Sequence, residues 1–124
     1  MAGMSSYLED EILDHTLGVG AYTMPTSIYI SVHSASPGGT GANEIASTTR
    51  QGDTAFNAAS SGATANTSAI TFTSMPSATV SHIGIWDAAA SGNFLWEGAL
   101  SSSVVCGSGD TFEIAAGDLD VTLD

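Results

Sequence analysis

Three histidines are the side chains of this sequence best suited to chemistry, because imidazole binds metals and exchanges protons near neutral pH. His15 falls in a predicted helix, while His33 and His82 fall in separate predicted strands. No two of them have the spacing of a metal-binding pair such as H-x-x-x-H, so the fold would have to assemble any site. We therefore expect ordinary structural or surface histidines and predict no metal site.

Carboxylates are more numerous and form one group near each end of the chain. Oxygen ligands of this kind suit Ca²⁺, but the spacing of an acidic calcium-binding loop is absent. A glycosidase needs two carboxylates at a defined separation across a cleft, and alternation along an exposed strand does not favour that arrangement. Solvated faces explain both groups, which are Glu9, Asp10, Glu11 and Asp14, and then Asp110, Glu113, Asp118, Asp120 and Asp124.

Nucleophiles and phosphate-binding loops lack support as well. Serine is abundant, but no G-x-S-x-G turn is present to expose one as a nucleophile. The glycine pairs are not followed by the lysine of a phosphate-binding loop. Cys106 lies among small residues and is expected to be buried and apolar. The sequence therefore predicts no enzyme, no cofactor and no catalytic residue.

The charge balance limits the partners. Thirteen acidic residues stand against a single arginine, Arg50, and no lysine, which gives a net charge of −12. Nucleic-acid backbones and anionic membranes both attract basic proteins, so neither is predicted as a partner. No apolar run approaches the ~18 residues of a membrane span. Two interpretations of the charge stay open: solubility alone, or a partner with a basic or apolar surface.

A helix is predicted over residues 6–17. Ser6 and Glu9 have the spacing of a capping box, and Gly18-Val19-Gly20 ends the helix. Apolar residues recur along it at helical spacing: Met4, Leu8, Ile12 and Leu13. This stripe is typical of a helix lying on its own sheet, and also of an N-terminal arm (residues 1–20) docked on a neighbouring protein.

From residue 25 onward the hydrophobic period changes to two, which indicates strands. The predicted strands are 28–33, 52–59 (the weakest, around Phe56), 69–73, 80–86, 93–100, 111–115 and 119–123. Evenly spaced short strands predict a mainly β fold, an antiparallel β-sandwich or jelly-roll-like domain with one N-terminal α-helix. A small barrel is the alternative. We expect one domain over residues 1–124, with the sandwich over 25–124.

Two tryptophans complete the candidate surface. Trp86 and Trp96 lie on adjacent predicted strands joined by the turn 87–92, so we expect them to be cross-strand neighbours. Core packing is the first interpretation, and a receptor-binding aromatic face is the second. Together with the helix, they give the candidate interface: Tyr7, Leu8, Ile12, Trp86 and Trp96.

Segments along the whole chain resemble a family of small tailed-phage virion proteins that are often labelled tail-fibre proteins. The segments are Ser6-Tyr7-Leu8, 12–17, Tyr22-Thr23, 28–31, Asn43-Glu44, Arg50-Gln51, 82–87, 92–95 and 109–111. None of them is a catalytic motif. Thr48-Thr49 precede Arg50 where an aromatic residue is expected, which leaves the pairing of this central segment open.

The resemblance implies a structural protein of a tailed-phage virion. The leading interpretation is a capsid decoration (cement) protein that stabilises contacts between major capsid subunits, because a small acidic β-domain with an arm suits such a clamp. A homotrimer is expected, since capsid lattices offer local three-fold sites. The alternative is a tail or tail-fibre component that adheres to the host. The expected partner is accordingly the major capsid protein or a tail protein.

Overall fold

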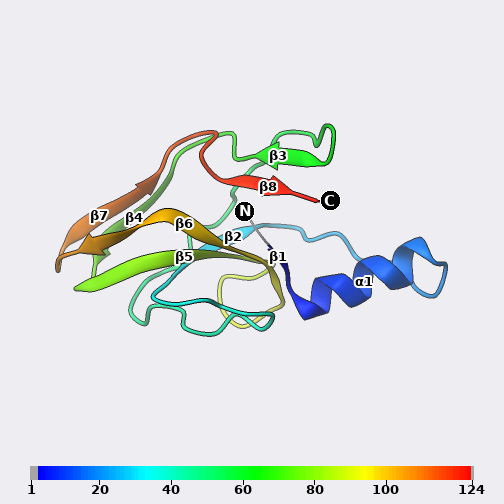
Figure 1. Cartoon of the computed structure of the whole chain (residues 1–124), viewed down its shortest axis with the longest axis horizontal. Coiled ribbons are helices and arrows are strands. Elements are labelled where there is room, and N and C mark those ends of the chain that lie inside the picture. The colour runs from blue at the N-terminus through cyan, green and yellow to red at the C-terminus, as the bar shows by residue number, and fades with distance from the viewer. Residues whose placement is uncertain (1–2, 124) are drawn as a thin grey trace.

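The computed structural model describes residues 3–123, which form a mainly β fold with one helix, as predicted. The largest sheet has four strands in the order β1-β6-β5-β2, and two further ribbons pair β3 with β8 and β4 with β7. All of these pairings are antiparallel (Figure 1). The elements are β1 (Gly3–Met4), α1 (Ser6–Thr16), β2 (Tyr29–His33), β3 (Ala63–Ala65), β4 (Ile70–Met75), β5 (Ala78–Trp86), β6 (Phe94–Cys106), β7 (Asp110–Ile114) and β8 (Asp120–Thr122).

The main hydrophobic core packs one face of the four-stranded sheet against the two ribbons, which gives the predicted sandwich-like arrangement. Ile30 and Val32 of β2 and Ile83 and Ile85 of β5 point to this face, because successive side chains of a strand alternate between its two sides. The ribbons supply the facing side chains: Ile70, Phe72, Met75, Phe112, Ile114, Leu119 and Val121.

The second face of the sheet is covered by a loop, residues 34–51, which we call the covering loop. A Cβ placed on Gly41 would lie 2.6 Å from the indole of Trp86, so the loop passes directly over this side chain. Glu44 and Gln51 form isolated bridges with the edge of β2, opposite His33 and Ile30. The central segment, whose pairing the sequence left open, therefore pairs with β2.

The structure corrects the start of the helix. Ser5, not Ser6, is the N-cap, and its Oγ accepts a hydrogen bond of 3.0 Å from the N–H of Leu8. The reason is tertiary: the N–H of Ser5 donates to the carbonyl of Leu95 on β6, which holds this residue at the turn from β1 into α1. The predicted capping box of Ser6 with Glu9 is therefore wrong. Met4 lies in β1 and is not part of the helical stripe.

The strand predictions need three further corrections. Residues 52–59 form no strand, because Asp53 has a φ of 54° and only Phe56 makes a bridge, to Asn66. Strands β1 and β3 were not predicted, since they contain two and three residues. Strand β6 continues past residue 100 to Cys106, through an irregular register opposite β5. Cys106 is a buried free thiol, as expected, and burial raises its pKa.

Candidate functional site: a buried anchor and a projecting arm

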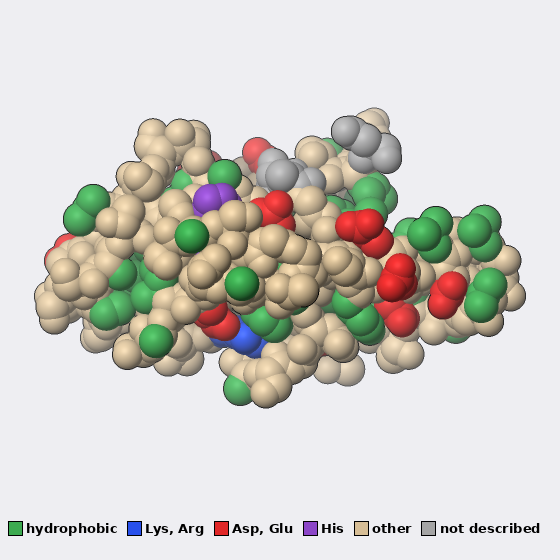
Figure 2. Space-filling model, turned by 60° about the horizontal axis from the view of Figure 1, so that its bottom comes forward, with side chains coloured by type: hydrophobic (Ala, Val, Ile, Leu, Met, Phe, Trp, Pro, Cys, Tyr) green, Lys and Arg blue, Asp and Glu red, His purple; other side chains and the backbone are tan. Residues whose placement is uncertain are grey.

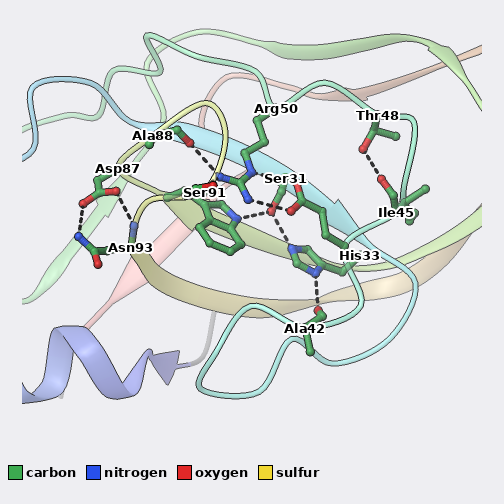
Figure 3. A network of polar contacts seen from close by, with 12 residues as sticks. Ser31, His33, Ala42, Ile45, Thr48, Arg50, Asp87, Ala88, Ser91 and Asn93 are labelled. Atoms are coloured by element: carbon green, nitrogen blue, oxygen red, sulfur yellow. Dashed lines mark hydrogen bonds and ion pairs between the residues drawn. The ribbon is translucent and has the colours of Figure 1, made fainter.

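A chain of hydrogen bonds crosses the sheet beneath the covering loop (Figure 3). The indole N–H of Trp86 donates to Ser31 Oγ over 2.8 Å, and Ser31 Oγ lies 2.6 Å from Nε2 of His33. Nδ1 of His33 lies 2.8 Å from the carbonyl oxygen of Ala42. A carbonyl oxygen only accepts, so Nδ1 carries the proton and Nε2 accepts from the Ser31 hydroxyl. This series of hydrogen bonds therefore links β5, β2 and the covering loop.

The geometry of Ser31 and His33 is that of a nucleophile beside its base, but burial gives it another role. The two residues are 1% and 0% exposed, so a substrate has no access to either side chain in this structure. Burial lowers the pKa of His33 below its ordinary value of 6.5, although the Ala42 carbonyl and the Glu44 carboxylate act in the opposite direction. The neutral imidazole matches the hydrogen bonds, and the pair acts as a structural link.

Arg50, the only arginine, fastens the covering loop to the turn between β5 and β6. Its guanidinium donates to both carboxylate oxygens of Glu44, at 2.9 Å each. It also donates to the carbonyl oxygens of Ala88 and Ser91, at 2.9 Å each, and lies 3.6 Å from the centre of the Trp86 ring. The side chain is 8% exposed. A planar fork with several donors makes this set of contacts, which lysine does not reproduce.

The turn that receives Arg50 is itself held rigid. The carboxylate of Asp87 accepts from the backbone N–H of Asn93 at 2.7 Å and from its side-chain amide at 2.9 Å. Gly92 has a φ of 75°, and a Cβ there would lie 2.5 Å from Ala88. We call Ser31, His33, Glu44, Arg50 and Trp86 the anchor, because together they fix the covering loop to the sheet.

A sequence profile of one phage family, described as Podophage GP4 fiber I protein gp80, matches residues 3–122. The chain belongs to this family. Membership confirms the resemblance to tailed-phage proteins labelled as fibre proteins, and fiber I membership makes the chain a structural component of a phage virion. All anchor residues except His33 lie in segments that carried the resemblance. No curated protein matches the chain significantly.

The second feature is an arm, which we define as residues 6–24: helix α1 and the chain that returns from its end. Figure 1 shows α1 extending away from the sheets. Its base is fixed, since Leu8 is buried. Its outer end is closed on itself, because the N–H of Val19 donates to the Asp14 carbonyl at 2.8 Å and the N–H of Tyr22 donates to His15 Nδ1 at 3.1 Å.

The arm exposes large apolar side chains next to acidic ones. Leu13, Leu17, Val19 and Met24 are 56%, 73%, 75% and 80% exposed. Figure 2 shows hydrophobic side chains gathered at the outer end of the arm, with acidic side chains between them and the sheets. The acidic residues of α1 are Glu9, Asp10, Glu11 and Asp14.

Two tyrosines of the arm have raised pKa values. Burial, followed by the charges of Glu11 and Asp87, raises the pKa of Tyr7. Burial, followed by Tyr7, Asp87 and Glu11, raises the pKa of Tyr22. Both phenols therefore stay neutral at physiological pH.

The residues predicted for the interface do not form one surface. Leu8 and Trp86 are buried within the chain, while Tyr7, Ile12 and Trp96 are half-buried. Trp86 is paired with Phe94 and Trp96 with Ile85, so the two tryptophans are not directly opposite each other. A change of one residue in a strand turns the side chain to the other face. Trp86 accordingly belongs to the anchor and Trp96 packs against the main core.

Sequence reasoning missed Leu17, Val19 and Met24 as candidates. The available signal was the position of large apolar residues around the glycines that end the helix, where a solvated turn is ordinarily polar. Among the described residues, no three His, Cys, Asp or Glu side chains gather to hold a metal ion. Within the same part of the chain, the one helix is too short and too polar to cross a membrane.

Proposed function

We propose that this chain is a subunit of the phage fibre apparatus and that the arm attaches it to a neighbouring virion protein. The observation that carries the proposal is the concentration of exposed apolar surface on one projecting element. Of the seven large hydrophobic side chains that are exposed in the described residues, four lie within residues 13–24. A contiguous exposed apolar patch rimmed by polar groups is typical of a protein–protein contact.

The body of the protein suits a platform for this arm. The anchor fixes the covering loop and the β5–β6 turn. Ser5, directly before the arm, is bonded to Leu95 of β6, and α1, which starts with Leu8 buried in its first turn, contacts β6. A rigid base lets an arm meet its partner with little loss of conformational entropy. The fiber I family name favours a place in the tail over a place on the capsid.

Capsid decoration is the alternative, and it would use the same arm at a junction between capsid subunits. Copy number separates the two roles. We expect quantitative mass spectrometry of purified virions, referenced to the major capsid protein, to find few copies, and labelled antibodies to mark the tail. Hundreds of copies spread over the capsid would contradict the fibre proposal and favour decoration.

Attachment through the arm has its own test. Virions that lack this protein are mixed with purified wild-type chain, or with a chain in which Leu17 and Met24 are replaced by serine. We expect the wild-type chain to bind and the variant to bind poorly. Val104→Ser with Val105→Ser is the matched control, since these residues are exposed and apolar but lie on β6. Equal loss in both variants would contradict a specific role for the arm.

A further inference from the structure

The arm carries information about the chemistry of its partner. Leu13 and Leu17 are four residues apart and therefore lie on the same face of the helix. Val19 follows directly after the turn, and the three are 56–75% exposed. Two exposed leucines at this spacing are typical of a helix that lies in an apolar groove of another protein. The centre of the partner surface is therefore apolar.

The charge of the arm indicates the chemistry at the edge of the partner surface. Helix α1 carries four carboxylates, Glu9, Asp10, Glu11 and Asp14, and residues 6–24 contain no lysine or arginine. None of these carboxylates takes part in an ion pair in the described structure, where the bridge between Arg50 and Glu44 is the only one. Like charges brought together at an interface cost several kcal/mol, whereas complementary ones steer association.

A second copy of this chain does not supply the complementary charge. Its only arginine is Arg50, which is 8% exposed and already paired with Glu44. The chain has no lysine and a net charge of −12. Two arms packed through their exposed leucines would instead bring together, from both copies, the carboxylates that lie three or four residues from one of these leucines, which are Glu9, Asp10 and Asp14.

We infer that the arm docks in an apolar groove flanked by lysine or arginine side chains on a different virion protein, not on a second copy of this chain. The inference rests on the proposed attachment role of the arm and adds the chemical class of its partner. Leu13 and Leu17 fill the groove, and the carboxylates beside them on the helix, Glu9, Asp10 and Asp14, meet the basic edge. Apolar contacts then determine how long the complex lasts, and charge determines how fast it forms.

The absence of lysine makes a direct test available. A carbodiimide joins a carboxylate to an amine that touches it, so a link from an arm carboxylate to a lysine must lead to another protein. In carbodiimide-treated virions, we expect peptides of α1 to be joined to lysines of one other virion protein. A benzophenone amino acid placed at Leu17 should give the same partner. Photoproducts that contain only two copies of this chain would overturn the inference.

Binding measurements on charge-neutralised variants are the second part of the test. The arm variant combines Glu9→Gln, Asp10→Asn and Asp14→Asn. The matched control neutralises the exposed acidic residues Glu113, Asp118 and Asp120 in the same way. Binding to virions that lack this protein is measured from low to high salt, with circular dichroism to check the helix. We expect the arm variant to associate about tenfold more slowly at low salt and to lose most of its salt dependence. The control should keep its salt dependence.

The outcomes separate the two proposals. If Leu17→Ser with Met24→Ser binds like the wild type, attachment through the arm fails, and this inference fails with it. If that variant binds poorly but the neutralised arm keeps the wild-type rate and salt dependence, the arm attaches the protein through apolar contacts alone. In that case attachment stands, and the basic edge of the partner is overturned.

Discussion

Gly84 has no side chain, and this leaves the space that the anchor residues Ser31 and His33 occupy. A Cβ at this position would lie 2.6 Å from both His33 Nε2 and Ser31 Oγ, and 2.8 Å from the Phe94 ring. Real Cβ atoms do not come this close to such neighbours, so the hydrogen-bonded side chains fit only because this residue of β5 has none.

Gly84→Ala should therefore destabilise the protein by about 1–3 kcal/mol through overpacking. Urea unfolding measures the change. Gly20→Ala is the control, because a Cβ there meets no atom within 4 Å and the φ of Gly20 is not in the left-handed region. Equal stability of Gly84→Ala and the wild type would show that Ser31 and His33 move aside without cost.

His33 gives the stability a dependence on pH. Its pKa is lowered by burial, so the unfolded chain takes up this proton at a higher pH than the folded chain does. The free energy of unfolding should be greatest above the ordinary value of 6.5 and should fall as the pH drops below it. We expect unfolding measured from pH ~7.5 to ~5.5 to show this slope. His33→Gln should remove it, while His82→Gln should keep it; a slope that survives in His33→Gln would assign it to other groups.

At the scale of an element, the stability of helix α1 depends on the buried hydroxyl of its N-cap residue. Ser5 is 0% exposed and caps the N–H of Leu8, whereas Ser6 is exposed. Ser5→Ala leaves that N–H without its acceptor and should cost about 0.5–2 kcal/mol. Ser6→Ala should change the stability by about 0.5 kcal/mol or less. Thermal unfolding of both variants decides which serine is the cap, and a larger loss for Ser6→Ala would restore the capping box that the sequence suggested.

The elements that the sequence predicted well are those with a strong local pattern. Ile30, Val32, Ile83 and Ile85 alternate with polar or small residues, and the strands that contain them were found almost to the residue. Strands β1 and β3 are too short to show a period, and β3 consists of Ala63-Thr64-Ala65. Their pairing with β6 and β8 is a long-range event that no local signal carries.

The candidate site was predictable only in parts. Glu44, Arg50 and Trp86 stood in segments with a family resemblance, but their meeting depends on the path of the covering loop and on the register of β2 with β5. The arm was foreseen as one of two alternatives. Its exposed residues were not, because exposure depends on how far α1 extends past β6, which the helical period does not determine.

At the scale of the whole molecule, the net charge of −12 governs self-association. A homotrimer stays a prediction, and copies that meet must overcome mutual repulsion, which salt screens over ~8–10 Å. Self-association should therefore strengthen as salt rises, in contrast to the salt-weakened binding that we expect for a basic partner. Sedimentation velocity at several salt concentrations measures it. Self-association that weakens with salt would mean that copies meet through opposite charges.

The contacts of Arg50 in the anchor also determine how susceptible the chain is to cleavage by trypsin. Trypsin cuts after lysine or arginine, so the sequence offers it one bond, between Arg50 and Gln51. The guanidinium that trypsin must grip is held by Glu44, and the backbone of Gln51 exchanges two hydrogen bonds with Ile30. Cutting requires the covering loop to lift first, and its rate then follows the population of the lifted form. The folded chain should therefore resist trypsin, and each cut, yielding fragments 1–50 and 51–124, would report one opening of the loop.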